Sequence, residues 1–127
     1  MTISRKSAFY LGVGSICVVL FIQAFNSFAC YEHNVITFIY TTVFFLTVPL
    51  IPAFISLGLL NPLRAVGACT LFVPWLIFAY YVDCIKPYAG GGASMVYVGV
   101  LFWGTPSAIL GAFITGPITR IFNIEVK

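Results

Sequence analysis

The sequence predicts an all-α, polytopic membrane protein with four transmembrane helices, and two observations lead to that prediction. Four long apolar stretches fill nearly all of the 127 residues, with only three short polar breaks between them. Hydrophobic residues make up 61% of the chain and charged residues 7%, against about 25% charged residues in an ordinary soluble domain. A soluble fold would have too few polar side chains to cover its surface. We therefore expect one domain over residues 1–127, an antiparallel up-down bundle of four helices.

The four apolar stretches have the lengths of membrane-spanning helices. They cover about residues 7–29, 35–60, 63–81 and 94–118. A helix needs roughly 20 residues to cross the hydrocarbon core of a bilayer. No Asp, Glu, Lys or Arg lies in the interior of a stretch, and Arg64 lies at the start of the third. Membrane-spanning β-strands would instead alternate in polarity over about ten residues, and the sequence has no such alternation.

The first stretch also has some features of a cleaved signal peptide. It follows two basic residues, and Ser27-Phe28-Ala29 at its end has the small-x-small pattern of a cleavage site. However, its apolar run of about 20 residues exceeds the roughly 7–15 residues of a signal peptide's apolar region. A lipoprotein signal cleaved before Cys30 would need other residues at positions 27 and 28. We therefore interpret the stretch as a helix that stays in the membrane.

The distribution of basic residues predicts the orientation of the bundle. Five of the six lie at the termini or in the second break: Arg5, Lys6, Arg64, Arg120 and Lys127. The first and third breaks hold Lys86 together with two acids. Because loops rich in Lys and Arg stay in the cytoplasm, both termini are expected there. The chain is thus predicted to be a multi-pass protein of a bacterial inner membrane. It is expected to contact the lipid bilayer and to bind no nucleic acid.

Small residues form a stripe along the fourth stretch, at Gly104, Ser107, Gly111 and Thr115. Steps of three and four residues place them on one helical face. In lipid, such a face lets two helix backbones approach closely. We expect it to pack on another helix of the same chain, with homo-oligomerisation as the alternative. The tight break at Asn61-Pro62 and the short first break make neighbours of the first and second helices, and of the second and third.

Polar and Trp side chains are expected to share one layer in the outer half of the bundle: Gln23, Asn26, Thr41, Thr42, Trp75 and Trp103. They would either line a recess that opens outward or form hydrogen bonds between helices. We prefer the second, since these residues are few and uncharged. Prolines interrupt three of the helices, at Pro49, Pro52, Pro74 and Pro106. Transporters place ligand sites at such breaks, but we interpret these prolines as ordinary kinks relieved by neighbouring groups.

Two of the four cysteines, Cys30 and Cys84, are predicted to lie together at the outer face. An oxidising compartment would permit a disulfide between them, worth about 4 kcal/mol by the chain-entropy account. Cys17 and Cys69 lie within helices and are expected to be small packing residues. Acidic residues and a His accompany the outer cysteines, at Glu32, His33 and Asp83. The paired spacing of a metal site is missing, so we expect no metal and no cofactor.

The available side chains argue against catalysis and proton transport. The only His, His33, lies outside the helices, and no charge is buried within them. Proton-coupled transporters carry an intramembrane acid or His, and a haem site needs an axial ligand. We therefore expect no enzyme and no catalytic residue. The expected function is binding to another membrane protein, as an accessory subunit, a regulator or an immunity factor against a membrane-directed toxin. The alternative is a small oligomeric channel or transporter for a neutral or weakly polar solute.

Overall fold

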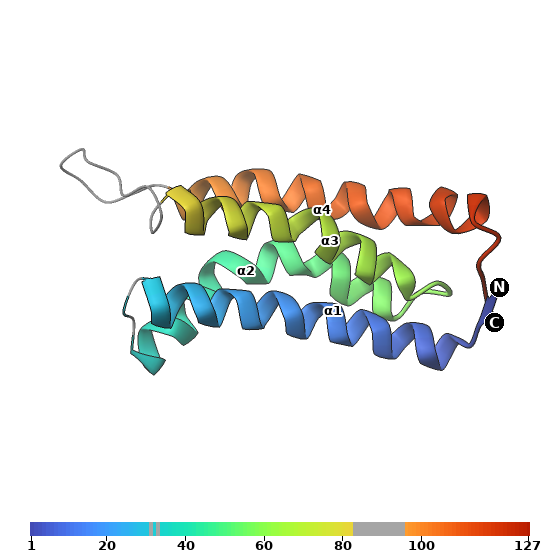
Figure 1. Cartoon of the computed structure of the whole chain (residues 1–127), viewed down its shortest axis with the longest axis horizontal. Coiled ribbons are helices and arrows are strands. Elements are labelled where there is room, and N and C mark those ends of the chain that lie inside the picture. Colours follow the sequence, from blue (N-terminus) through green and yellow to red (C-terminus); the bar gives the residue numbers. More distant parts are fainter. Residues whose placement is uncertain (31, 33, 83–95) are drawn as a thin grey trace.

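The computed structural model describes residues 1–30, 32, 34–82 and 96–127 (Figure 1). Its helices are α1 (Arg5–Phe25), α2 (Val35–Leu57), α3 (Leu63–Tyr80) and α4 (Val96–Ile121), and a π-helical segment η1 (Asn26–Cys30) continues α1. Each of the four helices is long and apolar enough to span a membrane. The prediction of an all-helical protein with four such helices is confirmed.

The helix ends differ from the predicted ones by a few residues. The second helix ends at Leu57 rather than near residue 60, because residues 58–60 form a turn in which the Gly58 N–H donates to the Ile55 carbonyl (3.1 Å). The fourth helix continues beyond residue 118 to Ile121 and includes Pro117. A proline removes only its own N–H from the helix, and tertiary packing can hold the remaining turns. The predicted start of this helix at residue 94 lies outside the described residues.

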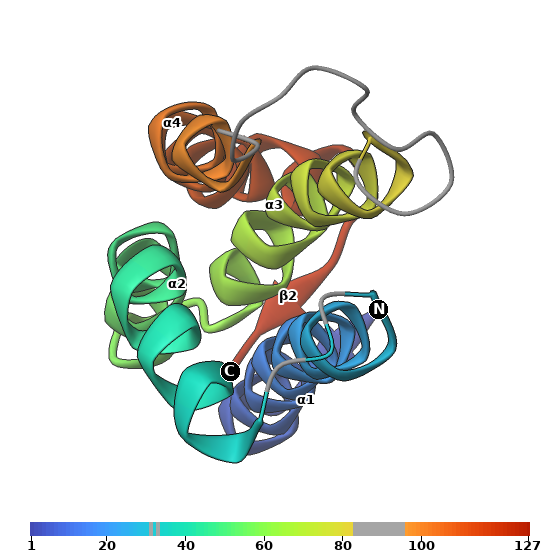
Figure 2. The same ribbon diagram turned by 90° about the vertical axis from the view of Figure 1, so that its left-hand side faces the viewer.

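Helix α3 lies at the centre of the packing. Both α2 and α3 contact each of the other three helices, and the contacts of α3 are the more extensive. Figure 2 views the bundle along the helices and shows α3 between α1 and α4. The contact between α3 and α4 is the most extensive, and α1 contacts α3 more than it contacts α2. The short break does bring α1 and α2 together, and Gly12 of α1 lies close to both neighbouring helices. A Cβ at Gly12 would lie 2.6 Å from the Leu57 side chain of α2 and 3.1 Å from the Ala65 Cβ of α3.

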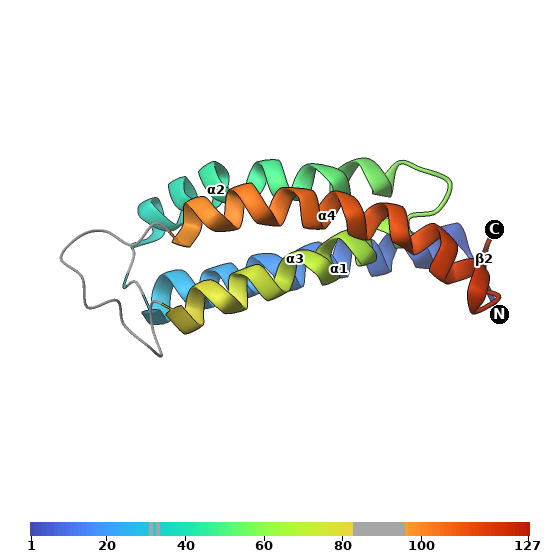
Figure 3. The same cartoon turned by 90° about the horizontal axis from the view of Figure 1, so that it is seen from above.

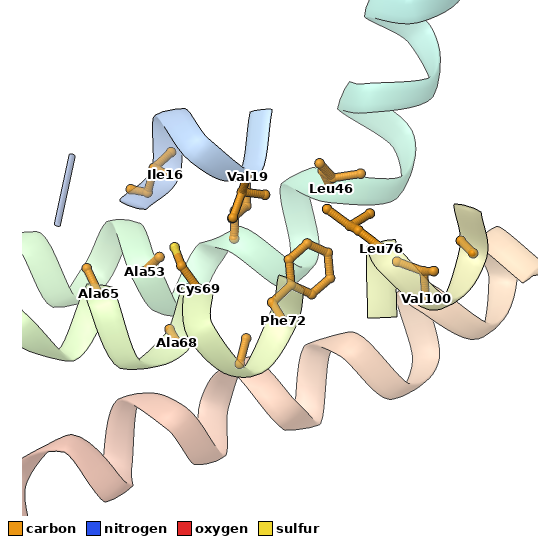
Figure 4. Packing of buried hydrophobic residues seen from close by; sticks show 13 residues of the cluster. Ile16, Val19, Leu46, Ala53, Ala65, Ala68, Cys69, Phe72, Leu76 and Val100 are labelled. Atoms are coloured by element: carbon orange, nitrogen blue, oxygen red, sulfur yellow. The ribbon is translucent and has the colours of Figure 1, made fainter. Parts of the chain in front are cut away.

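The core consists of apolar side chains from all four helices (Figure 4). Phe72 and Leu76 of α3 lie at its centre and are fully buried. Cys69 packs in the same cluster, as expected, whereas Cys17 is exposed on α1, so its predicted packing role is wrong. Large apolar side chains cover the exterior, among them Phe44 and Phe113, each 69% exposed. An apolar exterior around a filled interior suits a bilayer, where lipid replaces water around the protein.

The two chain termini are joined by a short parallel sheet that the sequence did not predict. Strand β1 (Thr2–Ile3) pairs with strand β2 (Glu125–Val126). The N-terminal amine donates to the Asn123 carbonyl (2.9 Å), and the Arg5 N–H donates to the Lys127 carbonyl (2.7 Å). Strands of two residues have no periodicity that a sequence pattern could reveal. Figures 1 and 3 show both termini at the end of the bundle that also holds the turn between α2 and α3.

The turn from α4 into β2 depends on Asn123, whose φ of 54° lies in the left-handed region. Its N–H donates to the Arg120 carbonyl (3.1 Å), and the N–H of Ile124 donates to the Thr119 carbonyl (2.8 Å). These two bonds form a Schellman motif, in which Asn is tolerated at the left-handed position. The motif ends α4 and directs the chain back toward the N-terminus.

Candidate functional site

The small residues of α4 lie against α3 in the structure. A Cβ at Gly104 would lie 2.5 Å from the Phe72 ring, and one at Gly111 would collide with the backbone of Gly67. The Thr115 side chain occupies the space in front of Gly67, and Ser107 accepts a hydrogen bond from Trp75 (2.9 Å). This face is therefore filled by a helix of the same chain and is not free for a second copy.

The predicted polar layer is divided between separate environments. Gln23 and Asn26 are fully buried on the α1 side of α3. The Gln23 amide donates to the Ser27 hydroxyl (3.3 Å), and the Asn26 amide donates to the Leu76 carbonyl (3.3 Å). Asn26 is the first residue of η1, so the π-helical segment is tied to α3 by a hydrogen bond between helices. Both side-chain amides thus have hydrogen-bond partners inside the bundle, a hydroxyl for Gln23 and a backbone carbonyl for Asn26.

The remaining residues of the predicted layer belong to other helices. Thr41 and Thr42 are half-buried on α2, and the buried Thr42 hydroxyl has no hydrogen-bond partner among the described residues. Trp75 of α3 and Trp103 of α4 stack, with ring centroids 6.4 Å apart and planes 18° apart. Trp75 contacts α4, where its N–H donates to Ser107, whereas Asn26 of η1 contacts α3 through the Leu76 carbonyl. The described contacts of these residues thus involve different helices, and whether they line one recess stays a prediction.

Trp103 lines a groove on the outside of α4. The groove has a volume of about 570 Å³, and its lining residues are Val98, Gly99, Phe102, Trp103 and Pro106. Trp103 is 64% exposed and Phe102 is 69% exposed. A Cβ at Gly99 would meet no atom within 4 Å, so the surface beside the helix is open there. Sequence reasoning named Trp103 but missed the groove, because the open side of Gly99 depends on how α4 is rotated.

The predicted disulfide between Cys30 and Cys84 stays a prediction, because Cys84 and the side chain of Cys30 lie outside the described part. His33 and Asp83 lie outside it as well. Among the described residues, no three His, Cys, Asp or Glu side chains come together as metal ligands. Cys17 and Cys69 are both free thiols.

The fold and the apolar exterior together define a multi-pass helical protein of membrane type. Comparisons with protein-family models, with curated proteins and with the solved structures give no match. The function is therefore argued from the contacts described above.

Proposed function

We propose that this chain is a protein of a bacterial inner membrane that has no catalytic role and acts by binding another membrane protein. The proposal rests on one observation above all: Trp103 is 64% exposed on the outside of α4, beside an open groove. The partner would be a transmembrane helix that packs into this α4 groove, which consists of the five lining residues named above. The partner could make the chain an accessory subunit, a regulator or an immunity factor.

The chemistry of the α4 groove favours a protein partner. Trp ordinarily lies at the membrane interface, where its N–H reaches water, and lipid tails offer that N–H no acceptor. A partner helix can offer a carbonyl or hydroxyl oxygen, and close backbone approach is possible at Gly99. Trp is also the residue type most enriched among side chains that dominate binding energy at protein interfaces. A groove beside a large ring is complementary to the ridge of side chains on a helix.

The filled interior favours binding over transport by a single bundle. Phe72 and Leu76 close the centre of the bundle, and Gln23 and Asn26 are bonded within it. The described interior thus contains no charged side chain that could relay protons. A channel would have to form between several copies, which is the alternative that the experiment below also tests.

The proposed orientation places both termini in the cytoplasm. The termini and the α2–α3 turn lie at one end of the bundle (Figure 1). Arg5 begins α1 there, Arg64 is in the first turn of α3, and Arg120 is in the last turn of α4. Basic residues next to membrane spans are retained on the cytoplasmic side.

The test is affinity purification of the tagged full-length chain from its native membranes in a gentle detergent, followed by native mass measurement. We expect one foreign membrane protein in a fixed ratio to the chain. Trp103→Ala and Phe102→Ala should each reduce its recovery at least tenfold. Phe44→Ala is the matched control, since Phe44 is equally exposed but lies on α2. Recovery of homo-oligomers without a foreign partner, combined with solute flux in liposomes, would contradict the proposal and support the channel alternative.

A further inference from the structure

A second feature of the molecule, independent of the α4 groove, is an unpaired arginine between two cavities at the end that holds the termini. Arg64 is half-buried in the first turn of α3. Its Nη1 donates to the Ala112 carbonyl of α4 (2.8 Å). The guanidinium lies close to α4 at Gly116, where a Cβ would lie 2.7 Å from Nη2. A side chain at position 116 would therefore force the end of the Arg64 side chain to shift.

The charge of Arg64 has no acidic partner in the described part of the chain. The one ion pair there joins Lys127 to Glu125 (3.6 Å), and both of these side chains are exposed. Arg120, in the last turn of α4, likewise lacks a described carboxylate partner. The guanidinium has five N–H donors in a planar fork, which matches the oxygens of a phosphate. An uncompensated Arg next to hydrocarbon is costly, so an anionic ligand would be strongly favoured there.

The two cavities that meet at Arg64 differ in character. The first lies between α2 and α4, has a volume of about 310 Å³ and is otherwise almost wholly apolar, lined by Ile51, Pro52, Ile55, Ser56, Leu59, Ile109, Ala112 and Phe113. The second has a volume of about 270 Å³, is much more polar, and includes Asn61, Thr119 and Arg120 in its lining. Arg64 is the residue that lines both. The pair therefore forms an amphiphilic site, with an apolar arm along the helices and a basic arm at their ends.

We propose that this site binds one anionic phospholipid, with its phosphate at Arg64 and Arg120 and an acyl chain between α2 and α4. A free phosphate would occupy only the basic arm. A zwitterionic lipid also carries a phosphate, but its ammonium group would bring a positive charge next to the two guanidinium groups. A phospholipid with a net negative charge can place its phosphate in the basic arm and an acyl chain in the apolar arm. Basic pockets between transmembrane helices on the cytoplasmic side are a recognised setting for such headgroups. The apolar arm is open to lipid, since Ile55 and Phe113 in its wall are 60% and 69% exposed.

The test is native mass measurement of the purified full-length protein titrated with phosphatidylglycerol, or with phosphatidylcholine of the same acyl chains. We expect one phosphatidylglycerol to be retained at least tenfold more strongly than phosphatidylcholine. Arg64→Gln should abolish that preference, and Arg120→Gln should reduce it. Lys6→Gln should not change it, because Lys6 is an exposed base at the same end that lines neither cavity. Equal retention of the two lipids by the wild-type protein would overturn the proposal.

A second variant separates the lipid from a free phosphate and does not depend on the folding of the Arg64 variant. Ile55→Trp fills the apolar arm from its exposed rim, and Ile39→Trp is its control on the same helix, 52% exposed and away from both cavities. We expect Ile55→Trp to lower retention of phosphatidylglycerol at least fivefold and Ile39→Trp to leave it unchanged. Unaltered retention in Ile55→Trp, or complete displacement of the lipid by millimolar inorganic phosphate, would refute an acyl chain in this groove.

Discussion

Adding one methyl group to the centre of the α3–α4 contact should destabilise the protein by a measurable amount. Gly111 of α4 lies directly against Gly67 and Ala68 of α3. A Cβ at position 111 would lie 2.8 Å from the Gly67 carbonyl carbon and 3.1 Å from the Ala68 Cα. Both are backbone atoms, so no side-chain rotation can make room for the methyl group. Gly111→Ala therefore has to move the two helices apart.

The magnitude follows from the size of that movement. Ordinary van der Waals contact begins at 3.4 Å, so the contact with the Gly67 carbonyl carbon alone requires a separation of about 0.6 Å, and the Gly67 carbonyl oxygen, which lies nearer still, requires more. Overpacking of this kind costs typically about 1–3 kcal/mol. Ala gains up to about 1 kcal/mol over Gly in helix propensity, which offsets part of the loss. We expect Gly111→Ala to lower the free energy of unfolding by up to about 2 kcal/mol, and to lie about 1–3 kcal/mol below Gly99→Ala, in which the same propensity gain has no overpacking to offset.

Gly99→Ala is the matched control, because it makes the same substitution in the same helix where a Cβ would meet no atom within 4 Å. It should leave the purified protein equally stable or slightly more stable. Unfolding in mixed micelles can be followed by the fluorescence of Trp75 and Trp103, which stack across the α3–α4 contact. If Gly111→Ala is as stable as Gly99→Ala, the described approach of the two helices is wrong.

Three further predictions concern individual hydrogen bonds. Asn26→Leu removes the donor to the Leu76 carbonyl and should lower the free energy of unfolding by about 0.6–2 kcal/mol in the same assay. Ser15→Ala loses only a hydrogen bond within its own helix and should lower it less. Ser107→Ala removes the acceptor of the Trp75 N–H, so the Trp75 emission spectrum should shift in a Trp103→Phe background; an unchanged spectrum would mean that the bond is not formed. Deletion of residues 124–127 should speed hydrogen exchange at the Arg5 amide, which donates to the Lys127 carbonyl, and unchanged exchange would contradict the terminal pairing.

The number and approximate bounds of the helices could be predicted because a membrane span is a local signal: about 20 apolar residues in succession. The small-residue stripe on α4 was also readable, since a helix face follows from spacing alone. Which helix that face contacts required the structure. The short first break predicted that α1 lies beside α2, but the contact of α1 with α3 is more extensive and follows only from the tertiary packing.

The candidate site was predictable only residue by residue. Depth along a helix can be counted from its ends, and this count is what led the sequence analysis to group Gln23, Asn26, Trp75 and Trp103. Rotation about the helix axis decides whether such residues meet, and an almost uniformly apolar helix gives little indication of its rotation. The groove at Gly99 and the site at Arg64 both depend on rotation and on contacts between helices distant in sequence. The paired termini were unpredictable for another reason, because each strand has only two residues.

The central claim, that the outside of α4 is covered by a partner protein, is tested most directly by photo-crosslinking in intact membranes. A photoreactive amino acid is placed at Phe102 in the α4 groove, and in a control at Phe44, which has the same exposure on α2. The account predicts an adduct of one discrete mass from position 102, containing a second membrane protein, and only lipid labelling from position 44. Lipid labelling alone at both positions would contradict it.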